Sequence, residues 1–139
     1  MEPYTSVKRV VIITNGVNDI GMACVREFLN NGYQIVYFSD RKINDISINS
    51  NKYVYFYCCD MSDHDHIKKA VNYVIVKFKQ IDCVVNCINT YSPSASIFEL
   101  NVAKRLSDID MFSIITLYKY GYDELKKNNA AIINVPNKI

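Results

Sequence analysis

The sequence predicts an α/β fold in which helices cover both faces of a parallel β-sheet. Short apolar runs alternate with longer mixed segments throughout the 139 residues. In the longer segments, apolar residues recur at helical spacing. The first apolar run leads through a tight turn directly into such a segment. Strands that alternate with helices in this way form parallel sheets with right-handed crossovers.

The expected strands cover residues 8–14, 34–39, 53–58, 81–86 and 130–135. The expected long helices cover residues 18–31, 62–79 and 103–127. We expect a loop or one short helix over residues 40–51 and a loop over residues 90–98. Gly32 ends the first helix, as glycine does at helix C-termini. Asp63 is the candidate N-cap of the second helix, and Gly121 is a weak point near the end of the third.

Composition favours a single soluble domain over residues 1–139. Half of the residues are apolar, which is enough to build a core. The formal net charge is only +2 and no dense basic block occurs, so nucleic acid is not an expected partner. The N-terminus lacks a signal-peptide pattern, and no apolar run approaches the roughly 18 residues that span a membrane. We therefore expect a cytoplasmic protein without a membrane partner.

The five cysteines are odd in number and include no CxxC pair. Several lie in apolar, strand-like runs, so we expect reduced thiols packed in the core rather than a disulfide framework. His64 and His66 lie among three aspartates, but residues two apart on a helix point in different directions. No metal site is therefore expected.

Residues 10–21, VVIITNGVNDIG, carry the most information about function. A strand that runs through a tight turn into a helix is the layout that holds a dinucleotide pyrophosphate. Three further segments follow in order: Asp60 after the third strand, NCIN at residues 86–89 and IINVPN at residues 132–137. Together the four segments resemble motifs of the short-chain dehydrogenase/reductase family, which read TGxxxGIG, an aspartate after strand three, NNAG and IINISS. The resemblance covers roughly residues 8–137 and is to the N-terminal half of that family.

The resemblance implies a doubly wound, Rossmann-like three-layer sandwich of about five parallel strands in the order 3-2-1-4-5. It also implies vestigial cofactor contacts at Thr14, Gly16, Asp19, Ile20, Gly21, Asp40, Asp60, Met61 and Asn86. An acidic residue after strand two binds the ribose hydroxyl of NAD, whereas a basic one accommodates the phosphate of NADP. Asp40 favours NAD if either cofactor binds, and a solvated loop is the alternative interpretation.

Two positions depart from the first motif, because Asn15 and Asp19 stand where the family has glycine. Asn15 is able to adopt the unusual dihedral angles of such a turn. Asp19 places a carboxylate where the diphosphate would sit, and like charges about 4 Å apart repel by roughly 4 kcal/mol at an effective dielectric constant near 20. The alternative interpretation is structural, since an acidic residue in the first turn stabilises a helix. We favour the structural interpretation and expect no cofactor.

The resemblance implies no catalytic residue in this chain. The position of the family's catalytic serine falls at Pro136 or Asn137, and that of its asparagine falls near Asp110. The YxxxK helix of the family would begin beyond residue 139. The strings that begin at Tyr73 and Tyr122 have the YxxxK pattern, but they precede the fourth and fifth strands and are interpreted as chance matches.

The leading hypothesis is therefore a truncated, catalytically inactive relative of these dehydrogenases that acts through protein association. The edge of the strand at residues 130–135 is the expected surface for a homodimer or a protein partner, partly blunted by Pro136, which cannot donate to a ladder. The alternative is an NAD(P)-binding oxidoreductase or nucleotide-sensing domain that is active only within a longer or multi-chain assembly.

Overall fold

A computed structural model describes the backbone of residues 8–17, 19–89 and 97–137, and the side chains of these residues except 88–89, 97–111 and 136–137. Its elements follow the order β1 (Val10–Thr14), α1 (Asp19–Asn30), β2 (Gln34–Ser39), α2 (Ile46–Asn49), β3 (Val54–Cys58), α3 (His64–Phe78), β4 (Cys83–Asn89), α4 (Ile97–Lys127) and β5 (Ala131–Asn137). All four strand pairings are parallel. The sheet order is β3-β2-β1-β4-β5, which confirms the predicted fold class and strand order.

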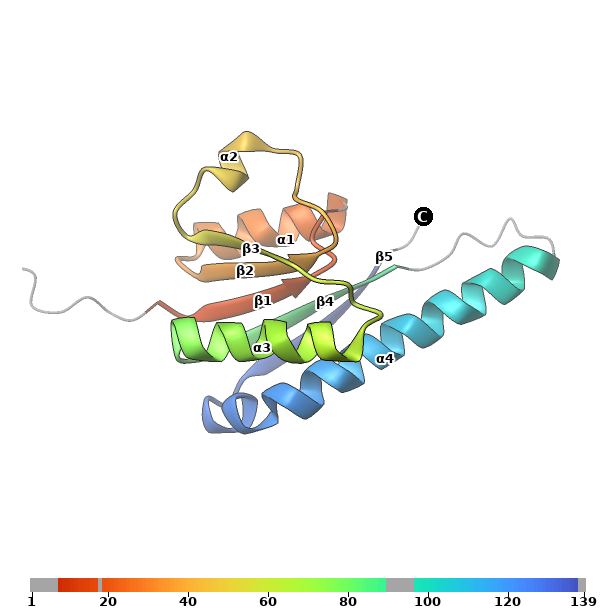
Figure 1. Ribbon diagram of the computed structural model, residues 1–139. Coiled ribbons are helices and arrows are strands. Elements are labelled where there is room, and N and C mark those ends of the chain that lie inside the picture. Colours follow the sequence, from red (N-terminus) through yellow and green to blue (C-terminus); the bar gives the residue numbers. More distant parts are fainter. Residues whose placement is uncertain (1–7, 18, 90–96, 138–139) are drawn as a thin grey trace, which may run out of the picture.

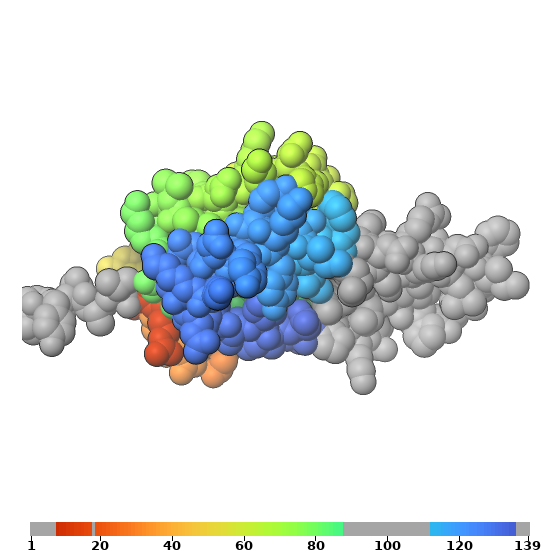
Figure 2. Space-filling model, turned by 90° about the horizontal axis from the view of Figure 1, so that it is seen from below, coloured from red at the N-terminus to blue at the C-terminus, as the bar shows by residue number. Residues whose placement is uncertain are grey.

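Helices cover the two faces of this sheet, with α1 and α2 on one side and α3 and α4 on the other (Figure 1). Seen from below, α3 and α4 lie against each other and form a continuous outer layer (Figure 2). Alternate side chains of β1 point to opposite faces of the sheet and contribute to both hydrophobic layers. Val11 and Ile13 pack toward α1, whereas Val10 and Ile12 pack toward α3 and α4. Because both faces are covered, β1 reads as a continuous apolar run rather than an alternating one.

The ends of several elements differ from the prediction. The loop expected over residues 90–98 is wrong at its end, because α4 already begins at Ile97; residues 90–96 lie outside the described residues. Helix-favouring Glu and Leu follow Ile97, and no Gly or Pro interrupts them. α4 continues through Gly121 to Lys127, and this buried glycine lies beside Val71 and Leu125.

Both strands at the far side of the sheet extend beyond their predicted ends. β4 continues to Asn89 and β5 to Asn137, and their parallel pairing is maintained to the last residue of each. The end of a strand depends on the pairing available from its neighbour, which a single segment of sequence does not contain.

Candidate functional site

The carboxyl end of the sheet brings the predicted site residues to one edge. The first motif follows β1, Asp40 follows β2, and Asp60 with Met61 follows β3, while Asn86 lies in β4. Because all strands are parallel, these ends meet at the same edge. β1 and β4 are neighbours, and the chain leaves them toward opposite sides of the sheet. Such a switch point is where open α/β sheets bind ligands.

Asn15 holds the turn after β1 against both neighbouring strands. Its φ of 55° is in the left-handed region, which Asn adopts more readily than most residues. Its backbone N–H donates to the Phe38 carbonyl at 2.8 Å. Its side-chain amide donates to the Cys87 carbonyl at 3.1 Å. The residue that replaces a family glycine thus spans the switch point, a role that the sequence pattern did not reveal.

Gly21 allows the start of α1 to lie directly on this turn. A Cβ atom at position 21 would lie 2.5 Å from the Cα of Gly16, closer than non-bonded atoms approach. Gly16, which is part of the turn, is itself buried. The fold therefore requires glycine at position 21 whether or not a ligand binds.

Asp19 is the first residue of α1, and its side chain is exposed. The N-terminal turn of a helix carries unpaired N–H groups and a partial positive charge. Either an anion or an acidic side chain satisfies this end, and here the chain supplies its own carboxylate. The negative charge of Asp19 opposes a pyrophosphate at this end of the helix. Ile20 follows it, half-buried.

A polar row crosses the sheet beside the turn. The Thr14 hydroxyl donates to the Asn86 side-chain carbonyl at 3.4 Å, and the Asn86 amide donates to the Asn134 side-chain carbonyl at 3.0 Å. The three residues are register partners in β1, β4 and β5. Thr14 and Asn86 are buried, so these bonds satisfy polar groups that would otherwise be costly to bury. Asn134 was not among the predicted site residues; its place in the IINVPN motif was the available signal.

The segment after β3 is held by both covering helices. The Asp60 carboxylate accepts bonds from the Ser62 hydroxyl at 2.6 Å and the Ser62 N–H at 2.9 Å, and these bonds lower the pKa of Asp60. The Asp60 N–H donates to Nδ1 of His66 in α3 at 3.0 Å. The carbonyl of Met61, a buried residue, accepts a bond from Ser113 of α4 at 2.7 Å. An ionised, exposed Asp60 is thus fixed at the site edge.

The two histidines of α3 have different partners, as their spacing predicts. Nε2 of His64 lies 2.7 Å from the Tyr120 hydroxyl, whereas His66 accepts from Asp60. Within the described residues, no three His, Cys, Asp or Glu side chains converge as a metal site would require. All five cysteines are free thiols.

The positions expected for catalytic groups lie on two elements. Asp110 is in α4, and Pro136 and Asn137 are in β5; their side chains lie outside the described residues. The strings that begin at Tyr73 and Tyr122 lie on α3 and α4, the helices of one covering layer. Neither string follows β5, where the family resemblance would place a catalytic YxxxK helix.

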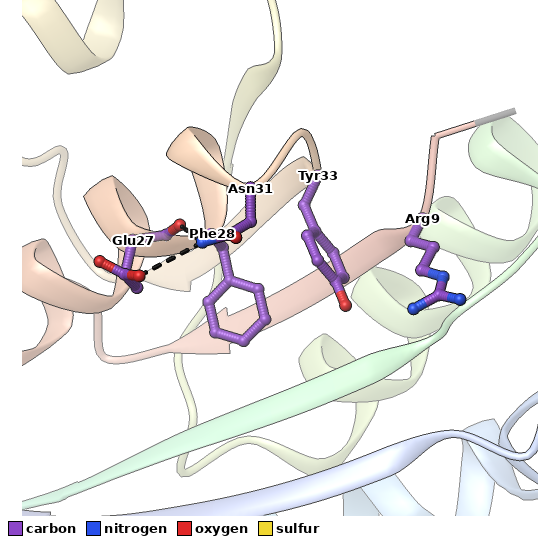
Figure 3. Close-up of a pocket in the computed structure, with 5 residues that line it drawn as sticks. All are labelled: Arg9, Glu27, Phe28, Asn31 and Tyr33. Atoms are coloured by element: carbon purple, nitrogen blue, oxygen red, sulfur yellow. Dashed lines mark hydrogen bonds between the residues drawn. The ribbon is translucent and has the colours of Figure 1, made fainter. Parts of the chain in front are cut away.

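Two described pockets lie at the opposite, amino end of the strands. They have volumes of about 400 and 450 Å³ and share Arg9, Phe28 and Tyr33. Figure 3 shows these three side chains directed to the same side of the ribbon. The rings of Phe28 and Tyr33 meet edge to face, with centroids 4.9 Å apart. Arg9 precedes β1 and Tyr33 precedes β2, so these pockets are separate from the turn after β1.

The chain belongs to the short-chain dehydrogenase/reductase family, since the family model described as short chain dehydrogenase matches residues 9–138. L-fucose dehydrogenase of Mus musculus is 27% identical over 135 residues, which cover 94% of this chain and 49% of that protein. Short-chain dehydrogenase reductase 3b of Arabidopsis thaliana is 28% identical over 116 residues, covering 78% of this chain and 42% of that protein. The chain thus spans about half the length of the curated relatives it matches.

Solved structures show the same fold. Aldohexose dehydrogenase of Thermoplasma acidophilum superposes with a TM-score of 0.74 at 21% identity, covering 91% of this chain and 48% of that one. The 3-ketoacyl-(acyl-carrier-protein) reductase of Brucella melitensis, solved with NADH, has a TM-score of 0.74 at 18% identity, covering 93% and 57% of the two chains. Among the helices of the described residues, none has the length and apolar character needed to cross a bilayer.

Proposed function

We propose that this chain keeps the nucleotide-binding framework of its oxidoreductase family but neither holds NAD(P) tightly nor catalyses hydride transfer by itself. Its role is then carried out through association with another protein or a second copy. The observation that carries this proposal is the exposed Asp19 carboxylate at the N-terminus of α1. That end of the helix is where a pyrophosphate would be held.

The contacts of Asn15 in the turn after β1 support the same proposal. Asn15 contributes its side chain to a bond with Cys87 in β4. The turn is therefore fixed by contacts within the protein at the position where the family pattern has a glycine. Together with Asp19, this arrangement serves the fold without a bound phosphate.

The alternative function is a dinucleotide-binding unit that works only within a longer or multi-chain oxidoreductase. The favourable observations are the close contact between Gly16 and Gly21 in the turn and the exposed carboxylates of Asp40 and Asp60 at the same edge. A ribose and an adenine offer hydroxyl and amine donors that such carboxylates accept. NAD is the cofactor that Asp40 favours over NADP.

Titration calorimetry with NADH and NADPH separates the two functions. Under the leading proposal, the wild-type chain shows no micromolar binding, and Asp19→Gly raises affinity for NADH by about tenfold or more, which corresponds to ~1.4 kcal/mol. Asp65→Gly is the matched control, because Asp65 is also an acidic residue in the first turn of a helix. Micromolar binding by the wild-type chain would overturn the leading proposal and support the alternative.

An assay of NADH oxidation with simple aldehydes, ketones and aldoses tests the catalytic part. We expect no turnover above the protein-free rate for the wild-type chain and for Asp19→Gly. Turnover that persists through a further chromatographic step would show that the chain contains catalytic groups at positions other than those of the family.

The proposed surface for association is the free side of β5. In the described sheet, β5 pairs with β4 on one side only. Ile133 is 42% exposed on this strand. Pro136 also lies in β5 and has no N–H to offer a further strand, which favours pairing through the earlier part of β5.

A further inference from the structure

β3 is an edge strand of the described sheet, because β2 is the one strand there that pairs with it (Figure 1). The Tyr53 carbonyl accepts a bond from β2 at 2.8 Å, and the Cys59 N–H donates to β2 at 2.8 Å. Alternate residues of a strand direct their backbone groups to the same side. The backbone N–H and carbonyl groups of Phe56 and Cys58, at the intervening positions, are therefore directed away from β2, along the outer edge of β3.

A cavity of about 280 Å³ borders this outer edge. It is lined by three consecutive residues of β3, 54–56, together with Tyr37 of β2, Asn49 of α2 and Lys42 between these two elements. The Tyr37 hydroxyl donates to the Asn49 side-chain carbonyl at 2.9 Å, which fixes this wall of the cavity. The outer edge of β3 thus faces a hollow with an ordered wall, into which an additional chain segment fits.

Four lysines lie around the first half of this edge, namely Lys8, Lys42, Lys52 and Lys77. The Nζ atoms of Lys8 and Lys52 lie 4.2 and 5.0 Å from the ring centroid of Tyr53, which directly precedes β3. Nζ of Lys77, on α3, lies 4.5 Å from the ring centroid of Tyr55. None of the four lysines forms an ion pair with another residue that the structure describes. Their charges are therefore available to a partner.

The aspartates of the neighbouring segments do not cancel this charge. Asp40 and Asp60 follow β2 and β3, so they lie at the carboxyl end of the strands, away from the lysines. Asp45, which caps α2, is already paired with Arg26. The first half of the outer edge is thus positively charged, and a negatively charged segment complements it.

We propose that the outer edge of β3 binds an extended acidic segment of a partner protein, which adds a strand to the sheet. The backbone of that segment bonds to Phe56 and Cys58, and its carboxylates lie against the lysines. A second copy of the same edge does not fit, because it would bring lysines against lysines. This surface is separate from β5 and from the turn after β1, so the proposal goes beyond the function proposed above.

Fluorescence anisotropy with a labelled octapeptide of alternating glutamate and valine tests the charge. At low ionic strength, we expect the full chain to bind this peptide at least about tenfold more tightly than a peptide of alternating lysine and valine. Lys42→Gln and Lys77→Gln should each weaken binding by about twofold to fivefold. Lys126→Gln is the matched control, because Lys126 also lies over a tyrosine ring but on α4, and it should leave the affinity unchanged. Equal affinity for the two peptides would overturn the proposal.

Hydrogen exchange of single amides tests the strand pairing. At saturation, the glutamate peptide should slow exchange at the Phe56 and Cys58 N–H groups by about threefold to tenfold. The Val54 N–H is the internal reference, since it already donates to the Asn51 carbonyl at 3.1 Å. A glutamate peptide methylated at every backbone nitrogen keeps its charge but loses its donors, and it should lose both the binding and the protection.

Cys58→Pro removes one outer N–H at an exposed position and should also weaken binding of the glutamate peptide. If this variant does not fold, the lysine variants and the methylated peptide still decide the matter. Unchanged exchange at Phe56 and Cys58, or equal binding of the methylated peptide, would overturn the proposal. Protection of these two amides that rises with protein concentration in the absence of peptide would do the same, because it would assign the edge to a second copy.

Discussion

The two glycines that lie in helices, Gly21 and Gly121, should differ in how a substitution by alanine changes the stability of the protein. A Cβ at Gly21 would lie 2.5 Å from the Cα of Gly16, whereas one at Gly121 would meet its nearest side chains at an ordinary 3.6 Å. We expect Gly21→Ala to lower the free energy of unfolding by about 1–3 kcal/mol through overpacking. Gly121→Ala should be neutral or add up to ~1 kcal/mol, since alanine favours the helix. Urea unfolding of both variants measures the difference, and similar values would contradict the close approach of α1 to the turn.

Burial also makes two neighbouring cysteine thiols differ in reactivity. Cys58 is exposed, whereas Cys59 next to it is fully buried. Desolvation raises the pKa of Cys59 to about 12, and that of Cys87 also to about 12. Because the thiolate is the nucleophile, Cys58 should be labelled first by an aromatic disulfide reagent at pH 8. Cys59 and Cys87 should react only on unfolding in urea. Peptide mapping checks this order, and equally fast labelling of Cys58 and Cys59 would contradict it.

At the scale of elements, the caps of α3 give a clear test. The Asp63 side chain accepts a bond from the His66 N–H at 3.1 Å, which confirms Asp63 as the N-cap. Asp65 lies in the first turn without a cap role and is 84% exposed at its side chain. Asp63→Ala should cost about 1 kcal/mol of unfolding free energy. Asp65→Ala should cost only a few tenths, from the helix dipole and the exposed contact with His64. Thermal unfolding at low ionic strength compares the two, and equal losses would show that charge rather than capping is what matters.

The existence and order of the elements could be predicted from the sequence because they depend on local patterns. Apolar runs defined the strands, helical spacing defined the helices, and Gly32 with its φ of 80° ends α1 as expected. Alternation of strands and helices then left a parallel sheet as the natural arrangement. The start of α4 was missed because polar serines lie just before Ile97, and nothing local separates a long loop from the first turn of a helix there.

Contacts within the candidate site required the structure. The turn after β1 and the aspartates after β2 and β3 could be assigned to one edge from topology alone. The bond from Asn15 to Cys87 joins residues 72 positions apart, and the Asn86–Asn134 bond joins residues 48 apart. Such pairs depend on the register between strands, which a period of two along each strand does not determine. Sequence therefore placed the candidate residues at one edge of the sheet, and the structure shows how their side chains are engaged.

At the scale of the whole molecule, β5 and α4 each carry an exposed isoleucine. Ile133 is 42% exposed on β5, and Ile115 is 60% exposed on α4. A lysine on an edge strand opposes strand pairing between molecules, because it places charge where a second sheet would dock. If association uses β5, Ile133→Lys should move the chain from dimer to monomer at concentrations where the wild type is dimeric.

Ile115→Lys distinguishes association through β5 from association through α4, because it adds the same charge on α4. Sedimentation velocity from about 5 to 200 μM covers the range in which weak dimers, with a free energy of association near −7 kcal/mol, dissociate. We expect the wild type and Ile115→Lys to share one concentration dependence, and Ile133→Lys to remain monomeric. Loss of the dimer in Ile115→Lys alone would place the interface on α4. A wild-type chain that is monomeric throughout the range, and that captures no partner through β5, would contradict association as the way this chain acts.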